Sequence, residues 1–217
     1  TSTQTGRGSF RVPPRDNRVG HAQSLTTAIA QAGRDLRAHA QEPVREIRDI
    51  GLEVVGQTKA LQLESLERLR NGLGIELRNV RLHQGQQFAT VFVPESKLAS
   101  FVKLFEDYAT ENTPKKNRPK NEKLVAGIDQ IRTPVLRSFW TDDDSLFPQD
   151  DITPIWWEVW LQTRVNDEPD GAMQAFVESV GTSELRVGEH VLRFPERLVF
   201  HVHGTVRQWN QVYVPML

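Results

Sequence analysis

Apolar residues recur at spacings of three and four along residues 18–48, and this pattern predicts an amphipathic N-terminal helix. The stripe consists of Leu25, Ile29, Ala32, Leu36 and Ala40. Pro43 is expected to interrupt or end the helix, because proline lacks a backbone N–H and its ring clashes with the preceding turn. Residues 1–17 are rich in Thr, Ser, Gly, Pro and Arg and are predicted to form a flexible arm.

Residues 49–112 show the pattern of a strand, a helix, two strands and a second helix. The first helix is expected to end at Gly72 or Gly74, and the two strands flank a polar turn at 83–87. The second helix is expected to begin at Ser96, which has the chemistry of an N-cap.

The segment 113–152 separates this unit from the rest of the chain. It begins as a basic linker with two prolines and continues with a helical pattern at 124–140, which Pro134 interrupts. It ends in an acidic loop at 141–151.

The first pattern returns in residues 153–217. A strand precedes a helix near 171–181, then two strands follow and another helix begins at Thr205. The inward stripe of the helix is predicted to contain Ala172, Phe176, Val177 and Val180.

The two units share landmarks at a nearly constant offset. Glu-Leu-Arg at 76–78 returns at 184–186, an offset of 108, and Ser96 corresponds to Thr205 at an offset of 109. An internal repeat of this kind is informative about architecture. We therefore predict an α+β fold with two tandem ferredoxin-like β-α-β-β-α(β) units, an N-terminal helix and a linker helix, where the last strand of the second unit lies near the C-terminal end.

Composition narrows the classes of function. The formal net charge is −1, so the chain is not built globally for nucleic acid or an anionic membrane. The basic linker also lacks interleaved aromatic residues, and no apolar run approaches the length of a membrane span. There is no cysteine, which removes disulfides and thiolate chemistry and fits a cytoplasmic location. We therefore expect that the chain binds neither nucleic acid nor a membrane.

Two short motifs suggest a serine peptidase active site. "VGTSEL" contains Ser183 and "FHVHGT" contains His203. The repeat favours another interpretation, in which Thr205 caps a helix and Gly181 ends one. A triad also requires an Asp and an exposed nucleophile, and here the Ser precedes the His by only 20 residues. We therefore predict no catalytic residue in this chain.

Metal and cofactor sites are likewise not predicted. His201 and His203 share one face of a strand, but the sequence offers no third ligand nearby. The acidic loop has Phe147 where a calcium loop needs glycine and Thr153 where it needs glutamate. No glycine-rich phosphate loop is present.

The tryptophans of "IWWEVWL" suggest a binding surface. Alternation places Trp157 on one face and Trp156 and Trp160 on the other, and the next predicted strand places His201 and His203 on that second face. An exposed pair of tryptophans would form a candidate protein interface. The alternative is that the helix around Trp140 covers this face within the chain.

Several stretches of this chain resemble the long N-terminal region of a group of bacterial subtilisin-like serine peptidases. The resemblance runs from about Arg15 to Trp209 and is carried by "RDNRVGHAQSLTTAI", "SLERLRNGLGIELRNVRLHQGQQFATVFVPESKLASFVKLFEDYATE", "RSFWTDDDSLFP", "IWWEVWL" and "LRFPERLVF". In that group the peptidase domain follows this region and supplies the catalytic Asp, His and Ser. The resemblance therefore implies a non-catalytic prodomain or regulatory domain.

The resemblance also implies a partner and a mode of action. Propeptides of subtilases are ferredoxin-like, assist folding of the peptidase domain, cover it with the outer face of their sheet and lay a C-terminal tail in the substrate cleft. The expected partner is thus a subtilisin-like peptidase domain, in cis or after cleavage. The expected contacts are Trp156, Trp160, His201, His203 and the apolar tail Tyr213, Val214, Pro215, Met216 and Leu217.

Two considerations keep other interpretations open. Pro215 cannot donate the backbone N–H that an extended inhibitor strand normally provides. Members of the group also lie beside an AAA-type ATPase and are associated with defence against phage. The alternative function is therefore an interaction or sensor module that recruits a partner such as that ATPase.

Overall fold

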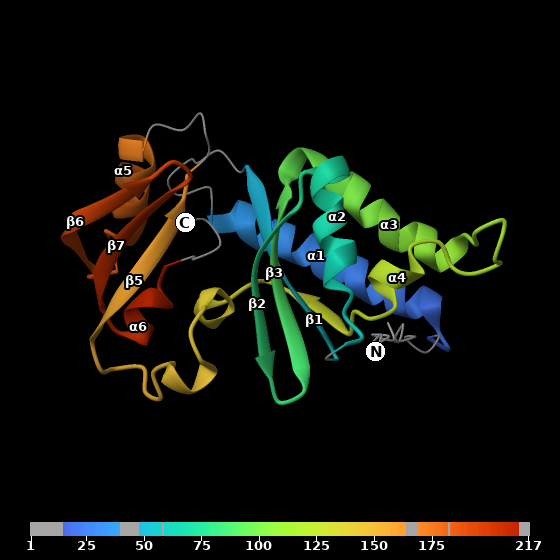
Figure 1. Cartoon of the computed structure of the whole chain (residues 1–217), viewed down its shortest axis with the longest axis horizontal. Helices are drawn as coiled ribbons and strands as arrows, with labels where there is room; N and C mark the ends of the chain where they lie inside the picture. The colour runs from blue at the N-terminus through green and yellow to red at the C-terminus, as the bar shows by residue number, and fades with distance from the viewer. Residues whose placement is uncertain (1–14, 40–47, 58, 164–168, 182, 213–217) are drawn as a thin grey trace, which may run out of the picture. The chain divides into compact units, whose positions relative to one another are not determined.

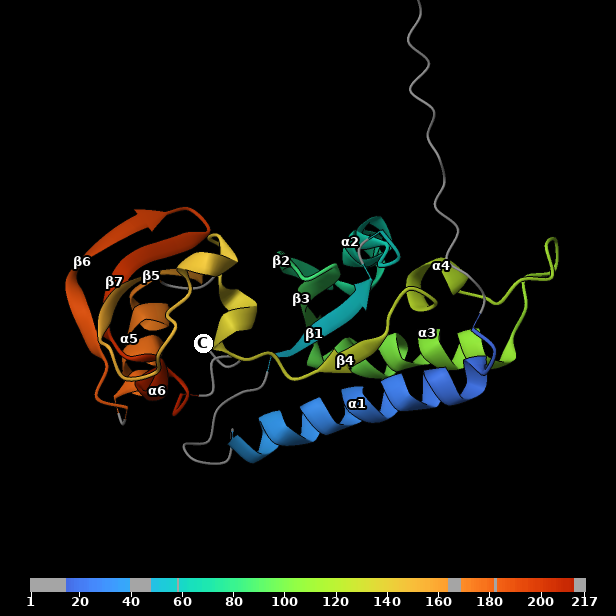
Figure 2. The same ribbon diagram turned by 90° about the horizontal axis from the view of Figure 1, so that it is seen from below.

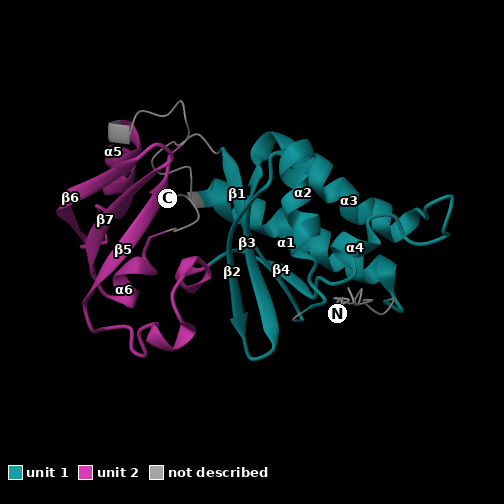
Figure 3. Cartoon of the chain, in the orientation of Figure 1, with its two compact units in different colours: residues 1–134 teal, residues 135–217 magenta. Residues whose placement is uncertain are grey.

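The computed structural model describes residues 15–39, 48–57, 59–163, 169–181 and 183–212 (Figure 1). The chain divides into two compact units, residues 1–134 and residues 135–217 (Figure 3). The sequence-based boundaries were different, because they separated the N-terminal helix and the segment 113–134 from the first unit.

The first unit contains four helices and four strands among the described residues. They are α1 (Arg18–His39), β1 (Asp49–Gln57), α2 (Leu63–Leu73), β2 (Glu76–His83), β3 (Gln86–Pro94), α3 (Leu98–Thr110), α4 (Glu122–Val125) and β4 (Gln130–Arg132), with a short 3₁₀ turn η1 (Glu95–Lys97) before α3. The strand order is β2-β3-β1-β4, and every neighbouring pair is antiparallel. This order places β1 and β2 on either side of β3, as in a split β-α-β arrangement.

The N-terminal helix belongs to the core of the first unit. Its predicted stripe is confirmed at Leu25, Ile29, Ala32 and Leu36, each at most 2% exposed, while Ala40 lies outside the described residues. Figure 2 shows α1 running alongside α3, and α1 also contacts β1 and β4. The apolar stripe of α1 therefore forms part of the packing of this unit.

The helix predicted at 124–140 is wrong. A single turn, α4, ends at Val125, and β4 then adds to the free edge of β1 with Ile131 buried opposite Val54. Gly127 permits this path, because a Cβ there would lie 2.0 Å from the carbonyl oxygen of Ala60. The apolar spacing of this segment is compatible with a helix. As a strand, however, it pairs with the backbone N–H and C=O groups at the edge of β1, which would have no partner there if the segment were helical.

A buried carboxylate lies on the sheet of the first unit. Glu53 is fully buried, and its two oxygens meet Arg81 at 3.2 Å and Arg132 at 2.6 Å. Both guanidinium groups also lie over the ring of Phe88, at 4.9 and 5.6 Å from its centroid. A buried charge is tolerated only when it is paired in this way.

Part of the basic linker is anchored to α3. Lys120 lies 2.8 Å from Asp107 and 2.9 Å from Glu111, and Lys103 lies 3.0 Å from Asp107. Hydrogen bonds from Lys120, then Lys103, lower the pKa of Asp107. These contacts attach the segment after α3 to the first unit.

The second unit contains three strands and two helices among the described residues. They are β5 (Ile155–Gln162), α5 (Pro169–Val180), β6 (Arg186–Phe194), β7 (Arg197–Gly204) and α6 (Val206–Trp209), preceded by the 3₁₀ turns η2 (Leu136–Phe139) and η3 (Asp144–Leu146). The strand order is β5-β7-β6, with both pairs antiparallel. It repeats the order of β1, β3 and β2.

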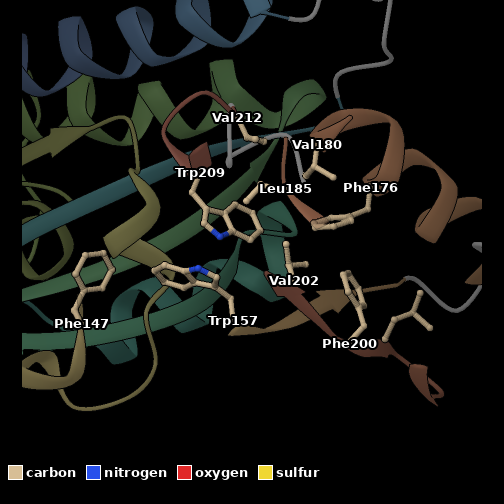
Figure 4. Close-up of a cluster of buried hydrophobic side chains, with 10 residues drawn as sticks. Phe147, Trp157, Phe176, Val180, Leu185, Phe200, Val202, Trp209 and Val212 are labelled. Atoms are coloured by element: carbon tan, nitrogen blue, oxygen red, sulfur yellow. The ribbon is translucent and has the colours of Figure 1, made fainter. Parts of the chain in front are cut away.

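An aromatic cluster forms the core of the second unit (Figure 4). Its buried members are Phe147, Trp157, Phe176, Val180, Leu185, Leu198, Phe200, Val202, Trp209 and Val212. Leu198, Phe200 and Val202 are the core-facing residues of β7, and they alternate with His201 and His203 as the pattern of the sequence indicates. The prediction that Val177 faces the core is wrong, because Val177 is 43% exposed whereas Phe176 and Val180 are buried.

Two helix caps were predicted, and the structure distinguishes them. Thr205 accepts a hydrogen bond from the N–H of Gln208, whose side chain accepts one from the N–H of Thr205. This capping box confirms the prediction. Ser96 is not the N-cap, because η1 intervenes and α3 begins at Leu98 with no side-chain cap.

The α+β class is confirmed by the two antiparallel sheets and their helices. The complete tandem ferredoxin-like repeat stays a prediction, because the last strand expected in the second unit falls at residues outside the described ranges. Within the described part of the chain, no helix has the length and apolarity needed to span a bilayer.

Candidate protein-binding face of the second unit

The two faces of β5 differ sharply in exposure. Trp157 points into the core and is 6% exposed, whereas Trp156 and Trp160 are 56% and 60% exposed. Successive side chains of a strand point to opposite faces, so this difference follows from the alternation of the sequence. We call the side that carries Trp156 and Trp160 the outer face.

Strand register brings the predicted residues together on the outer face. Trp156 lies opposite His203, Glu158 opposite His201 and Trp160 opposite Val199. The ring centroids of Trp156 and His203 are 5.0 Å apart, and those of Trp156 and His201 are 6.3 Å apart. The four predicted residues Trp156, Trp160, His201 and His203 therefore lie on one face of the sheet.

The outer face extends onto β6 further than predicted. Leu192 lies opposite Val199 on β7, and Phe194 lies opposite Arg197. Leu192 and Phe194 are 62% and 51% exposed. The alternation in "HVLRF" indicates that Leu192 and Phe194 share one face of β6. The sequence does not show that this face is the exposed one, because that depends on the register between β6 and β7. With the two tryptophans, these residues make a large apolar patch for one small sheet.

Two polar side chains restrain Trp160, which lies at one end of the outer face. The indole N–H of Trp160 donates to the carboxylate of Glu158 at 2.6 Å. The guanidinium of Arg197 lies over the same indole ring, 5.3 Å from its centroid. A cation–π contact and a hydrogen bond restrict the ring, which lowers the entropy lost when a partner binds it.

A bulge in β6 hollows the middle of the outer face. Between Val187 and Val191 the strand carries two more residues than the matching part of β7. Gly188 fits closely there, since a Cβ would lie 3.2 Å from the carbonyl oxygen of His201. The resulting open hollow is lined by Trp156, Arg186, Val187, Gly188, Glu189, His190 and His201.

The helical turn around Trp140 does not cover this face. Trp140 packs edge-on against Phe147 and Trp157, with ring centroids 5.5 and 6.0 Å apart, and so belongs to the core side of the sheet. Of the two alternatives left open by the sequence, the structure therefore selects an exposed outer face.

The peptidase-like motifs occupy structural positions. Ser183 is buried, and its hydroxyl donates to the carbonyl oxygen of Val180 at 2.6 Å, just after α5 ends. His203 lies on the outer face beside Trp156, and Thr205 caps α6. Ser183 thus lacks the exposed setting of an activated nucleophile.

The acidic loop uses its carboxylates to shape the backbone. Asp143 accepts from the N–H and hydroxyl of Ser145, and Asp150 accepts from Ile152 and Thr153. These hydrogen bonds lower the pKa of both aspartates, with the Ser145 hydroxyl and the Thr153 N–H as the largest causes. Across the ranges that the structure describes, no three His, Asp or Glu residues gather as metal ligands.

The tail residues Tyr213, Val214, Pro215, Met216 and Leu217 lie outside the described residues. Of the predicted contact set, the structure therefore places the four residues on β5 and β7.

Comparison with known proteins bears on the first unit. Residues 19–134 match the model of a family described as the Y4kK N-terminal domain. This match covers just over half of the chain and ends where the first compact unit ends. A search of curated proteins finds no match. The outer face described above lies beyond the matched residues.

Proposed function

We propose that this chain, which belongs to the Y4kK N-terminal domain family, is a non-catalytic N-terminal region that binds and restrains a subtilisin-like serine peptidase domain. The family description names an N-terminal domain, which is in keeping with a region that precedes another domain. The resemblance of residues 15–209 to the N-terminal region of subtilisin-like peptidases supplies the class of partner. We propose that this chain and the peptidase domain bind each other in the cytoplasm, which is consistent with a chain that has no cysteine.

The observation that carries this proposal is the outer face of the β5-β7-β6 sheet. It presents two tryptophans, of which Trp160 is restrained by Glu158 and Arg197, and two further apolar side chains, and all four are more than half exposed. Trp and Arg are enriched among residues that dominate binding energy. A sheet face of this composition suits burial against a helix or a second sheet of a partner.

In this proposal the outer face covers the peptidase domain and the tail at 213–217 enters the substrate cleft. The region then acts as an intramolecular chaperone during folding, and as an inhibitor in cis or after cleavage. Inhibition needs no catalytic residue in the chain, only a stable interface.

Inhibition of a peptidase domain tests the proposal. The full chain is added to the peptidase domain encoded with it, and hydrolysis of a chromogenic peptide and surface binding are measured. We expect inhibition at micromolar concentrations or below. The double variant Trp156→Ala, Trp160→Ala should bind about 30-fold or more weakly, since hot-spot residues contribute about 2 kcal/mol or more.

Leu82→Ala provides a matched control, because Leu82 is 62% exposed but lies on β2 of the first unit. It should inhibit as the unchanged chain does. Absence of binding and inhibition at micromolar concentrations refutes the proposed function. Unchanged inhibition by the tryptophan variant refutes the role of the outer face.

A second candidate is an interaction module that recruits another protein, such as an AAA-type ATPase. The observation that favours it is that the outer face lies outside the residues matched by the family, so family membership does not restrict its partner to a peptidase domain. Co-purification of the chain with the purified ATPase, in the absence of any peptidase domain, distinguishes this candidate from the first.

A further inference from the structure

A small basic hollow lies beside the start of α1 in the first unit. Its volume is about 230 Å³, several times the roughly 30 Å³ that a water molecule occupies in the liquid. Its lining includes Arg15, Arg18, Tyr108, Asn117, Arg118 and Glu122. These residues come from three separate parts of the chain: the start of α1, the end of α3 and the segment before α4.

Tyr108 is the unusual member of this lining. Its side chain is only 1% exposed and its ring packs edge-on against that of His21, while it lines the hollow with no hydrogen bond from its hydroxyl to the described residues. Burial raises the pKa of this hydroxyl, and the charges of Arg15, Glu122 and Arg18 also act on it. The hydroxyl therefore remains a protonated donor close to these charges.

The cations around the hollow differ in how far the fold engages them. Arg15 is committed, because it donates to the carbonyl oxygens of Ala126 and Ile128 and pairs with Asp129. Arg18 donates one bond to Asn112 at 2.7 Å and keeps further N–H groups.

Arg118 offers the most available cation. Its guanidinium has no hydrogen bond or ion pair among the described residues, and its backbone carbonyl is fixed by the N–H of Thr113 at 2.7 Å. Asn112 also donates to Asn117 at 2.9 Å, which ties the rim together. The rim is thus held in place while its donors remain open.

Charge and donor geometry select the class of ligand. Because Arg15 is paired with Asp129, two guanidinium groups, those of Arg18 and Arg118, remain against the single carboxylate of the lining, Glu122, and the first turn of a 22-residue helix adds a positive dipole. The lining contains donors from two arginines and one hydroxyl on different elements, and such a set suits a tetrahedral oxyanion with several acceptor oxygens better than a planar carboxylate. We propose that this hollow binds a phosphate group through Arg18, Arg118 and the Tyr108 hydroxyl.

Calorimetric titration of the full chain with inorganic phosphate tests the proposal, with sodium chloride at matched ionic strength as the blank. The variant Arg118→Gln should weaken binding about tenfold, the loss expected for one charge-assisted hydrogen bond. Tyr108→Phe keeps the buried ring, removes only the hydroxyl and should weaken binding several-fold. Lys116→Gln is the matched control: it removes one charge from the same segment but is not part of the lining, and it should leave affinity within about twofold.

A parallel titration with phosphoserine identifies the source of the phosphate group. Tighter binding of phosphoserine than of phosphate indicates a phosphorylated ligand, and the reverse order indicates the free ion; either supports the site. The proposal is overturned if phosphate does not bind saturably, or if Lys116→Gln weakens binding as much as Arg118→Gln. Thermal unfolding verifies that Arg118→Gln is folded, because the Arg118 side chain is exposed and makes no hydrogen bond or ion pair among the described residues. None of these outcomes depends on the peptidase-binding proposal.

Discussion

Two adjacent tryptophans on β5 provide a direct test of the fold of the second unit. Trp157 is buried, and its indole N–H donates to the carbonyl oxygen of Gly204 at 2.9 Å. Its ring contacts those of Trp140 and Trp209, with centroids 6.0 and 6.1 Å apart. Trp156, one residue earlier, points to the outer face and is 56% exposed. The same substitution at both positions therefore separates the two faces.

Trp157→Phe removes the indole N–H and leaves the Gly204 carbonyl without this donor in a buried position. An unsatisfied buried group costs about 1–3 kcal/mol, and weakened aromatic packing adds about 0.5–1.5 kcal/mol per pair. We expect the free energy of unfolding of the second unit to fall by about 2–4 kcal/mol. With a urea m-value near 2 kcal/mol/M, the midpoint should drop by about 1–2 M. Trp156→Phe should change stability by no more than about 0.5 kcal/mol.

Hydrogen exchange measured by mass spectrometry over a urea series is the appropriate assay. Peptides from β5 and β7 report the second unit separately from the first, so no assumption of a single transition is needed. Equal losses for the two variants, or a loss below about 0.5 kcal/mol for Trp157→Phe, would show that the assignment of faces is incorrect.

Three further predictions concern single contacts. In urea unfolding, Thr205→Ala should destabilise the second unit by about 1 kcal/mol, whereas Ser96→Ala should change the stability of the first unit by less than about 0.5 kcal/mol. The reason is that Thr205 caps a helix and Ser96 does not. A larger effect of Ser96→Ala than of Thr205→Ala would contradict this assignment of the caps. Burial lowers the pKa of His21, whose Nε2–H donates to the Ile128 carbonyl at 2.7 Å, so the neutral ring is favoured in the native state. The stability of the first unit should therefore be constant above about pH 6.5, and it should decrease as the pH falls from there to the lowered pKa of native His21. His21→Gln should remove this pH dependence in thermal unfolding measured between about pH 5 and 8. If the pH dependence persists in the variant, His21 is not its source. Glu53→Gln should lower the urea midpoint of the first unit by the equivalent of about 3 kcal/mol, since it removes the buried carboxylate charge that Arg81 and Arg132 share. A neutral effect would mean that these ion pairs are dispensable.

Local patterns were sufficient for most elements of the fold. The stripe of α1, the hairpin turn and the alternation of β5 each depend on residues that are close in sequence. The turn between β2 and β3 illustrates this, because Gln84 and Gly85 both adopt positive φ, at 47° and 77°, as a two-residue hairpin loop requires. In each case the prediction needed only the geometry of one element.

The errors occurred where a distant partner decided the local structure. Residues 130–132 have a helix-compatible pattern, but they form β4 because the edge of β1, some 75 residues earlier, offers backbone partners. Val177 lies on the predicted apolar stripe of α5, yet it is 43% exposed, whereas Phe176 and Val180 are buried. Neither outcome can be read from a short window of sequence.

The candidate binding face shows the same division. Alternation within β5 and within β7 by itself determined that Trp156, Trp160, His201 and His203 point away from the core. Only the tertiary structure decided that Trp140 packs on the core side, that Leu192 and Phe194 extend the patch, and that the hollow beside Tyr108 exists. The direction of a side chain follows from backbone geometry one residue at a time, whereas the neighbours it meets depend on strand register and packing between segments far apart in the chain.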